Sequence, residues 1–471
     1  MVKMNIGMVG MAVMGSNLAL NMADKGFDVA CYNYTPDLTE KVMKEHPHEH
    51  MHPFYDLKSF VESLEKPRKI MFMIMAGAPV DSMLNQLLPL LEPGDIVMDG
   101  GNSFFEDTRR RHDLALEKGV SFFGVGISGG EKGARLGPCI MPGGDKDAYE
   151  YVRPIYEAIA AKAGQEPCCA YIGSDGAGHY VKMVHNGIEY ADMQLIAESS
   201  LLMKHVGGIQ NHQMADVFNQ WNQGELKSFL IGITADIFAE KDDLAAGELV
   251  DKIEDSAGQK GTGRWTSIQA MKQGVNTSMI TAACNNRVMS NLLLERKALG
   301  EVLPAPEKIE TVDEAFLEDV RRSLYAGKIA AYAQGFSLYR SAASTYNWQL
   351  DFGKIAAIFR AGCIIQAEFL NKITEAYQRQ PQLANLMLDE FFMKKIQENL
   401  PSLRRIVSLA IANGVPVPAL ANAITYIDSF RAQQLGANII QAQRDYFGAH
   451  TYKRIDREGS FHHEWQEHFA K

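Results

Sequence analysis

The stretch "NIGMVGMAVMGSNLAL", residues 5–20, decides the fold of the N-terminal third of the chain. Its first apolar run predicts a buried strand, and "SNLALNMADKG" predicts a helix that ends at Gly26. Between them, Gly10, Ala12 and Gly15 form a G-x-A-x-x-G version of the dinucleotide-binding fingerprint. Gly10 permits the tight turn, Ala12 lets the backbone approach a pyrophosphate, and Gly15 lets the helix pack on the strand. The stretch therefore predicts a strand, a turn and a helix that together bind a dinucleotide.

The alternation of apolar runs and helical patterns continues through the first 130 residues. Strands are predicted in "FDVACYNYT", "KIMFMIMAG", "DIVMDGGN" and "VSFFGVGISGG", and this order is typical of right-handed βαβ units and a parallel sheet. From about residue 179 to 433 the pattern changes to long helices. We predict an α/β Rossmann-type N-terminal domain, residues 1–177, followed by a large all-α domain, residues 178–433. A C-terminal tail, residues 434–471, has too little apolar pattern to be a domain.

The end of the second predicted strand bears on the choice of dinucleotide. Proteins that bind NAD usually place an acidic residue there to hold the ribose 2′-hydroxyl, and its carboxylate would repel a 2′-phosphate. This chain has Asn33, Tyr34 and Thr35, so nothing rejects NADP and no cation plainly selects it. We expect NADP, with NAD as the alternative.

The segment "GHYVKMVHNGIEYADMQL", residues 178–195, predicts a helix with an unusual polar face. Lys182, His185, Asn186 and Glu189, with Tyr190 beside them, recur at helical spacing and stack on one side. A solvated face is the simpler interpretation, but such faces are normally filled with Glu and Lys rather than His, Asn and Tyr. Because a glycine-rich linker leads from the sheet into this helix, the face is expected to look toward the dinucleotide.

Two further segments carry groups suited to an anion. The loop "SAGQKGTGRWT" offers Lys260 and Thr262 among glycines, although a flexible surface loop is the alternative. Arg287 lies on a predicted helix, where most arginines are simply exposed. Arg444 and His450 lie in the tail, beyond the last long helix, and a tail of this kind needs another surface to order it. A neighbouring subunit is the expected surface.

Composition limits the partners and the compartment. The formal net charge of −10 argues against nucleic acid and anionic membranes as partners. No apolar run is long enough for a membrane span, and the N-terminus does not read as a signal peptide, so a cytoplasmic protein is expected. Six cysteines without metal-ligand spacing are expected to be reduced thiols. "EHPHEHMHPF" holds four alternating histidines, but we expect an exposed loop there and no metal site.

Long motifs across the whole chain make it resemble the 6-phosphogluconate dehydrogenase family, within the β-hydroxyacid dehydrogenase superfamily. They are "GMAVMGSNLALN", "DGGNSFFEDT", "ISGGEKGARLGPCIMPGG", "GAGHYVKMVHNGIEYADMQL", "AGQKGTGRWT" and "AQRDYFGAHTY". The resemblance implies NADP-dependent oxidative decarboxylation of 6-phosphogluconate to ribulose 5-phosphate and CO2. It also implies a homodimer in which the tail of one subunit completes the active site of the other.

The resemblance assigns roles to individual residues. Lys182 would be the general base and Glu189 the general acid. Substrate contacts would come from Asn102, Ser128, Gly129, Gly130, His185, Asn186, Tyr190, Lys260, Thr262 and Arg287, with Arg444 and His450 from the partner subunit. Cofactor contacts would come from Gly10, Ala12, Val13, Met14, Gly15, Asn33, Tyr34, Thr35, Met75, Ala76 and Asn102.

This chain departs from the family at two cofactor positions. The family commonly has an arginine where this chain has Tyr34, and often a lysine where it has Met75. Both departures remove a cation that could pair with the 2′-phosphate of NADP. Three alternatives stay open: an NAD-preferring version of the same enzyme, a dehydrogenase that does not decarboxylate, and a catalytically silent NADP-binding regulator.

Overall fold

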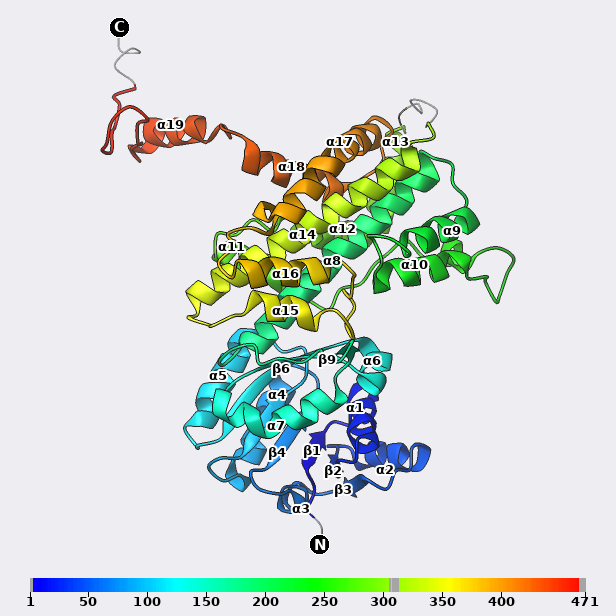
Figure 1. The fold of residues 1–471 in the computed structure, drawn as a ribbon, viewed down its shortest axis with the longest axis vertical. Helices are drawn as coiled ribbons and strands as arrows, with labels where there is room; N and C mark the ends of the chain where they lie inside the picture. Colours follow the sequence, from blue (N-terminus) through cyan, green and yellow to red (C-terminus); the bar gives the residue numbers. More distant parts are fainter. Residues whose placement is uncertain (1–2, 305, 307–312, 466–471) are drawn as a thin grey trace. The chain divides into compact units, whose positions relative to one another are not determined.

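The computed structural model describes residues 3–304, 306 and 313–465, in which the N-terminal part is built on a seven-stranded sheet (Figure 1). Its strand order is β3-β2-β1-β4-β5-β6-β7. The strands are β1 (Ile6–Val9), β2 (Val29–Tyr32), β3 (Met51–Phe54), β4 (Lys69–Phe72), β5 (Ile96–Asp99), β6 (Ser121–Ser128) and β7 (Cys139–Gly143). The helices among them are α1 (Val13–Asp24), α2 (Pro36–Glu45), α3 (Leu57–Ser63), α4 (Ala78–Leu87), α5 (Phe105–Leu116), α6 (Gly130–Leu136) and α7 (Lys146–Ile159). A short hairpin, β8 (Lys162–Ala163) and β9 (Glu166–Pro167), follows.

A second part of the chain is helical, as the sequence predicts. Its helices are α8 (Ala177–His205), α9 (Asn211–Trp221), α10 (Phe229–Ala239), α11 (Thr262–Lys272), α12 (Ser278–Ser290), α13 (Leu293–Val302), α14 (Phe316–Thr345), α15 (Phe352–Ile358), α16 (Leu370–Arg379), α17 (Glu390–Ala412) and α18 (Pro418–Arg431). The predicted fold class, a Rossmann-type domain followed by a large helical one, is confirmed. No helix in the described ranges is both long and apolar enough to cross a bilayer.

Two details of the sheet differ from the sequence-based expectation. The sheet is not purely parallel, because β7 pairs antiparallel with β6. The connection from β6 to β7 holds only the seven-residue helix α6, and a reversal of direction needs no long crossover. The expected exposed loop at the histidines is wrong at its end, since His52 lies in the edge strand β3, whereas His46, His48 and His50 lie in the connection before it. Its "MHPF" sequence hides the strand signal because proline is tolerated in a strand mainly at a sheet edge.

Two of the histidines, His50 just before β3 and His52 within it, are held by Asp28, the residue before β2. His50 Nδ1 lies 2.9 Å and His52 Nε2 3.0 Å from the same oxygen of Asp28. These hydrogen bonds, His50 first and His52 second, lower the pKa of Asp28. Within the part of the chain that the structure describes, no group of three or more His, Cys, Asp or Glu side chains is placed to hold a metal ion.

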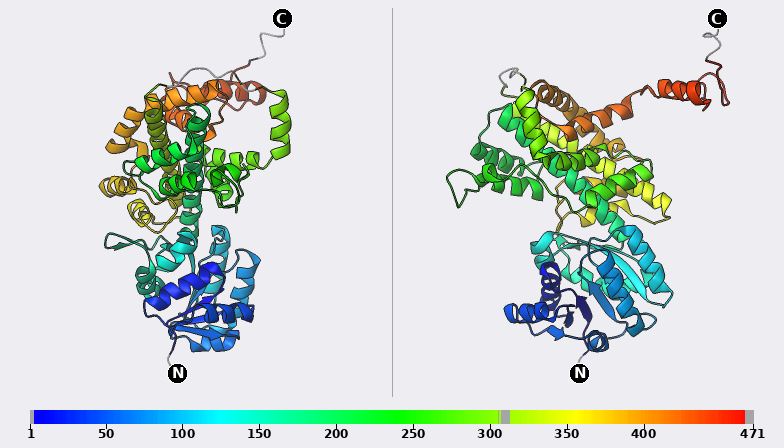
Figure 2. Two further views of the ribbon diagram at one scale, coloured as in Figure 1. Left: turned by 90° about the vertical axis from the view of Figure 1, so that its right-hand side faces the viewer. Right: turned by 180° about the vertical axis from the view of Figure 1, so that it is seen from behind.

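The long helix α8 starts on the sheet and continues into the helical part, as the three ribbon views show (Figures 1 and 2). Glycines make its close approach possible. A Cβ added at Gly178 would lie 2.2 Å from the carbonyl oxygen of Gly124, and one added at Gly124 would lie 2.7 Å from His179 Nδ1. A Cβ at Gly126 would lie 2.5 Å from Lys182 Cβ. The first turns of α8 are therefore seated directly on β6.

In the helical part, α8 packs against α14, and a buried ion pair joins the two helices. Lys328 Nζ donates to both carboxylate oxygens of Asp192 at 2.6 Å, and both side chains are almost completely excluded from solvent. Buried charges are tolerated only when they are paired, so this contact specifies one rotation of α8 against its neighbour.

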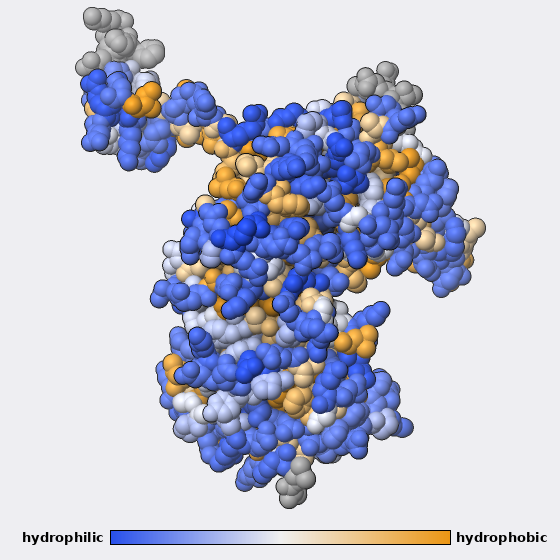
Figure 3. All heavy atoms as spheres, viewed as in Figure 1, coloured by the Kyte–Doolittle hydropathy of each residue, from blue (hydrophilic) through white to orange (hydrophobic). Residues whose placement is uncertain are grey.

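Hydrophilic side chains cover most of the face seen in Figure 3.

The chain divides into two compact units, Met1–Ala423 and Ile424–Lys471. The second unit contains a helix that was not expected in the tail, α19 (Ala437–Gly448). The buried carboxylate of Asp445 organises this unit, because it accepts hydrogen bonds from Thr451 N, His462 Nδ1 and Trp465 Nε1 at 2.7–2.9 Å. The predicted boundaries at residues 177 and 433 stay predictions.

Candidate active site

A cavity of about 1100 Å³ lies between the carboxyl ends of the strands and the helical part of the first unit. Ligands of open α/β sheets bind at this end of the strands. The predicted site residues that line it are Ala12, Val13, Met14, Met75, Ala76, Asn102, Asn186, Glu189, Tyr190, Lys260, Thr262 and Arg287. The cavity thus brings together the dinucleotide loop, the polar face of α8 and the glycine-rich loop before α11.

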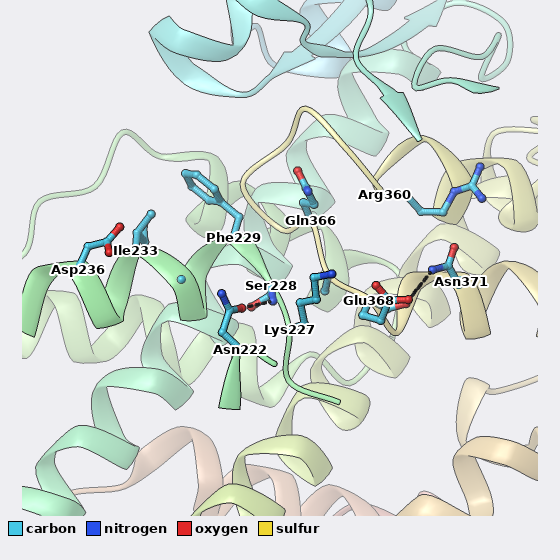
Figure 4. A pocket seen from close by; sticks show the side chains of 12 residues that line it. Asn222, Lys227, Ser228, Phe229, Ile233, Asp236, Arg360, Gln366, Glu368 and Asn371 are labelled. Atoms are coloured by element: carbon cyan, nitrogen blue, oxygen red, sulfur yellow. Dashed lines mark hydrogen bonds between the residues drawn. The ribbon is translucent and has the colours of Figure 1, made fainter. Parts of the chain in front are cut away.

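A second hollow, of about 420 Å³, lies beside the start of α10 (Figure 4). Several of its polar groups bond one another: Asn222 Oδ1 accepts from Ser228 N at 3.0 Å, and Asn371 Nδ2 donates to Glu368 Oε1 at 3.3 Å. It contains none of the motif residues that the sequence singles out. The larger cavity is therefore the candidate active site.

The turn after β1 has the geometry that a dinucleotide pyrophosphate needs. Gly10 has a φ of +101°, and a Cβ there would lie 2.5 Å from the carbonyl oxygen of Met73. A Cβ at Gly15 would lie 1.8 Å from the carbonyl oxygen of Gly10. Because both positions exclude a side chain, the backbone N–H groups at the start of α1 stay open to a phosphate. The residues present therefore fit a dinucleotide.

Asn33 supports this turn from the end of β2. Its Oδ1 accepts a hydrogen bond from Met11 N at 3.1 Å, and its Nδ2 donates to the Thr35 carbonyl at 3.0 Å. The amide is thus engaged in shaping the loop. Tyr34 and Met75, by contrast, are 79% and 75% exposed.

A hydrogen-bonded chain joins the predicted catalytic lysine to its neighbours. Lys182 Nζ donates to Asn186 Oδ1 at 2.8 Å, and His185 Nδ1 lies 2.9 Å from the same oxygen. Asn186 Nδ2 donates to Thr262 Oγ1 at 3.1 Å, which links α8 to the start of α11. His185 Nε2 lies 3.4 Å from Ser128 Oγ, at the end of β6. The polar face of α8 is therefore a connected network rather than a solvated surface.

Burial sets the protonation of the three titratable groups on this face. It lowers the pKa of Lys182, which is only 7% exposed, against the opposing effect of Glu189. It raises the pKa of Glu189, against the opposing effects of Lys182 and Arg287. Burial and the Lys182 charge together hold the pKa of His185 well below its ordinary value. Burial therefore shifts the amine of Lys182 and the carboxyl of Glu189 toward their neutral forms.

Arg287 joins the cavity wall from α12. Its guanidinium carbon lies 3.6 Å from the centre of the Tyr190 ring, and its Nη1 donates to the Gly258 carbonyl at 3.1 Å. A stacked arginine of this kind keeps its remaining donors directed along the ring plane. Arg287, Lys260 and Thr262 place two cations and a hydroxyl around one end of the cavity.

Other predicted residues do not line the cavity. Lys182 and His185 are buried behind Asn186, to which both are hydrogen-bonded, and the buried Ser128 lies next to His185. The dinucleotide turn and its surroundings contain Gly10, Gly15, Asn33, Tyr34 and Thr35. Gly129 and Gly130 follow β6 with φ of +117° and +63°, and a Cβ at Gly129 would lie 2.6 Å from the Gly362 carbonyl oxygen. Arg444 lies on α19 and His450 in the turn that follows it, both in the second compact unit.

Comparison with known proteins matches almost the whole chain to two family models. The NAD binding domain of 6-phosphogluconate dehydrogenase matches residues 5–173, and the 6-phosphogluconate dehydrogenase C-terminal domain matches residues 178–465. The chain belongs to the 6-phosphogluconate dehydrogenase family. This confirms the family that the sequence motifs indicate.

Members of the 6-phosphogluconate dehydrogenase family are similar over their full length. The decarboxylating enzyme of Escherichia coli is 54% identical over 99% of this chain and 100% of its own. Two decarboxylating enzymes of Bacillus subtilis, one NAD(+)-dependent and one NADP(+)-dependent, are 52% and 51% identical. They cover 98% and 99% of this chain, and 99% and 100% of their own chains. Because the identities to the NAD(+)-dependent and the NADP(+)-dependent enzyme are nearly equal, they do not show which dinucleotide this chain prefers.

A solved structure of Plasmodium falciparum 6-phosphogluconate dehydrogenase shares the fold. It is 44% identical, covers 98% of this chain and 100% of its own, and has a TM-score of 0.95. That enzyme was studied in its apo form, with its cofactor NADP+ and with its substrate 6-phosphogluconate.

Sequence reasoning missed residues that shape the site without offering a reactive group. Cavity-lining residues not expected are Met73, Ile74, Gly100, Gly101, Ile127, Gly258, Gln259 and Trp265. Gly124 and Gly126 were also missed, although "GVG" inside a strand is a readable signal. Glycine weakens a strand and often marks a place where another backbone comes close.

Substitution of Gly126 by alanine is expected to lower kcat about 100-fold, because the added Cβ meets Lys182 Cβ and displaces the base from its seat. Steady-state kinetics with a thermal unfolding curve for each variant measures this effect. Gly300→Ala on α13 is the matched control, since nothing lies within 4 Å of a Cβ there. A Gly126→Ala enzyme with wild-type kcat would show that the seat does not position Lys182.

Proposed function

We propose that the protein oxidises and decarboxylates 6-phospho-D-gluconate, yielding D-ribulose 5-phosphate and CO2 with reduction of NADP. One observation carries the residue assignment: Glu189 lines the same cavity as the dinucleotide turn and the cations Lys260 and Arg287. The buried Lys182 lies behind this wall and donates a hydrogen bond to Asn186, which lines the cavity. The relatives that cover the whole chain are decarboxylating 6-phosphogluconate dehydrogenases, which supports the same reaction.

Lys182 acts as the base and then as an acid. Its amine, whose pKa burial lowers, takes the proton of the substrate C3 hydroxyl. A bound nicotinamide supplies the acceptor for the hydride that leaves C3. When the carboxylate departs as CO2, the electron pair of the broken bond moves toward the C3 carbonyl. Lys182 returns its proton to that oxygen, which gives a neutral enediol.

Glu189 completes the reaction by protonating carbon. Burial raises the pKa of its carboxyl, so the group can hold a proton in a site built to bind anions. It donates that proton to the enediol carbon that becomes C1 of the product, while the neutral amine of Lys182 takes the proton from the neighbouring enediol oxygen, so that this oxygen becomes the ketone of ribulose 5-phosphate. Asn186 and His185 orient the lysine through their shared contact, and neither needs to change its own charge.

The substrate carries a phosphate and a carboxylate, whereas the chain has a net charge of −10. Fixed local cations must therefore hold the substrate. We assign Lys260, Thr262 and Arg287 to this role in one subunit, and Arg444 and His450 to it from the tail of a partner subunit. The active enzyme would thus be a homodimer with composite sites. No role for nucleic acid or membrane is proposed, and six buried free thiols fit a reducing, cytoplasmic setting.

The decisive test of this function is the ratio of CO2 released to dinucleotide reduced. Purified protein with 6-phosphogluconate should reduce NADP or NAD at 340 nm and release an equal amount of CO2. Reduction without CO2 would indicate a dehydrogenase that does not decarboxylate. Dinucleotide binding without turnover would indicate a silent regulator.

The exposed Tyr34 makes the dinucleotide preference adjustable. Tyr34→Arg is expected to raise kcat/KM for NADP about tenfold and to change that for NAD less than about threefold. The reason is that the new guanidinium, exposed and screened by solvent, can pair with the 2′-phosphate of NADP, and NAD has no such phosphate. Parallel kinetics with the two dinucleotides measures the ratio. Tyr34→Phe, which keeps the ring, is the control and should leave the ratio near that of the wild type. If Tyr34→Arg changed kcat/KM for NADP and for NAD equally, the 2′-phosphate of NADP would not lie near residue 34.

A further inference from the structure

Arg111 on α5 is a completely buried guanidinium whose three nitrogens all face hydrogen-bond acceptors. Nε and Nη2 lie 2.8 and 3.1 Å from the two carboxylate oxygens of Asp81, and Nη2 also donates to the Gly77 carbonyl at 3.0 Å. Nη1 lies 3.4 Å from Ser103 Oγ and 3.6 Å from Asp99 Oδ2. One side chain thus bridges the segment after β4 and the segment after β5.

Both bridged segments belong to the cavity. Met75 and Ala76 lie just before Gly77 and line it, and so do Gly100, Gly101 and Asn102. These segments follow neighbouring parallel strands, so they lie side by side at the carboxyl edge of the sheet, where open α/β sheets bind dinucleotides.

Asp99 determines how the second segment turns. Its Oδ1 accepts from Gly101 N at 3.0 Å, and its Oδ2 accepts from Ser103 Oγ at 2.6 Å. Asp99 and Ser103 are buried as a result, whereas Asn102 between them is exposed to the cavity. The carboxylate and the guanidinium together direct Asn102 outward.

The arrangement requires an arginine. A planar guanidinium can donate hydrogen bonds to Asp81, Gly77 and Ser103 at the same time, whereas the donors of a lysine ammonium all lie on one nitrogen atom. The adjacent Arg110 provides an internal comparison. It also bonds Asp81, at 2.8 Å, but its side chain is 54% exposed and its other ion-pair partner is Asp107 on the same helix.

We propose that Arg111 is a positioning residue that fixes the spacing of the two cofactor segments, and thereby the distance over which hydride moves from substrate to nicotinamide. This inference rests on the function proposed above. Arg111 itself touches neither substrate nor nicotinamide in this scheme, so its effect must reach the reaction through Met75, Ala76 and Asn102.

The test compares Arg111→Lys and Arg111→Gln with Arg110→Gln. Three quantities are measured: the Kd of NADPH from its fluorescence, kcat and KM for 6-phosphogluconate, and the isotope effect with substrate deuterated at C3. Both Arg111 variants should weaken NADPH binding about tenfold, lower kcat about 30-fold and raise the isotope effect, with KM for 6-phosphogluconate within about threefold. Arg110→Gln should leave all three near wild type.

A purely structural role for Arg111 would give a different pattern. Loss of folded protein would reduce activity in proportion to the folded fraction, with the Kd and the isotope effect of the remaining enzyme unchanged, and this result would overturn the inference. So would equal effects of the Arg110 and Arg111 variants. If the Arg111 variants do not fold, Ser103→Ala decides: it removes one link of the bridge and should raise the isotope effect and the Kd in the same direction.

The experiment distinguishes a failure of the Arg111 proposal from a failure of the proposed reaction. If the wild type binds NADPH but does not turn over 6-phosphogluconate, the proposed reaction is wrong. The NADPH Kd of the Arg111 variants against Arg110→Gln would still report on the spacing of the two segments. An unchanged Kd in that case would overturn the inference as well.

Discussion

Replacement of Lys182 by methionine is expected to lower kcat about 1000-fold while KM for 6-phosphogluconate changes less than about threefold. The side chain is nearly completely buried on the sheet, and its amine donates to Asn186 at 2.8 Å. Methionine keeps the length of the stem and removes only the titratable group. Because a general base acts mainly in the transition state, turnover should fall far more than affinity. Steady-state kinetics and an unfolding curve measure the effect.

The matched control for this variant is Lys204→Met on the same helix. Lys204 is half exposed near the end of α8 and pairs with Asp251, away from the cavity. Its replacement should leave kcat unchanged, so a general effect of losing a lysine from α8 can be separated from the loss of the base. Substantial turnover by Lys182→Met would remove Lys182 from the proposed role.

A 1:1 mixture of Lys182→Met and Arg444→Ala, assayed with substrate far below the raised KM of Arg444→Ala so that each variant alone is nearly inactive, should recover about a quarter of wild-type activity once subunits exchange. Arg444→Ala alone should raise KM for 6-phosphogluconate about 100-fold, since it removes a charged partner of a bound anion. If the tail of one subunit completes the site of the other, half of the dimers are mixed. Each mixed dimer has one site with both defects and one site with neither.

The control mixture combines Lys182→Met with Glu189→Gln. Both residues lie on α8 of the same chain, so every site in a mixed dimer carries one of the defects and activity should stay low. Mass spectrometry of subunits with different isotope labels confirms the exchange. Mixtures that exchange subunits yet stay inactive in the first experiment would mean that each chain builds its own site.

The dinucleotide domain could be predicted well because its signals are local. The G-x-A-x-x-G turn sits between a strand and a helix, and the structure shows that neither Gly10 nor Gly15 has room for a Cβ. Strand β3 was not predicted because "MHPF" has a proline and a histidine where a strand usually has apolar residues. Strand β7 was not predicted either, because "CIMPG" contains a proline and a glycine, residues that are depleted in strands.

The candidate site was predictable where one helix carries the chemistry. Helical spacing on α8 placed Lys182, Asn186 and Glu189 together, and in the structure Lys182 bonds Asn186 while Asn186 and Glu189 line the same cavity. Arg111 could not be recognised, because its partners come from segments that only the fold brings together. The roles of Arg444 and His450 depend on a second subunit and stay predictions.

The seating of α8 on β6 also limits how the sequence can drift during evolution. Each residue turns an α-helix by about 100°, so one inserted residue between Lys182 and Glu189 would rotate everything beyond it by more than a quarter turn. The base would stay against the sheet while Glu189 and Tyr190 swung away from the cavity. An insertion within residues 243–247, which are exposed and follow α10, would merely lengthen a surface connection, whereas the seven-residue spacing between Lys182 and Glu189 cannot change.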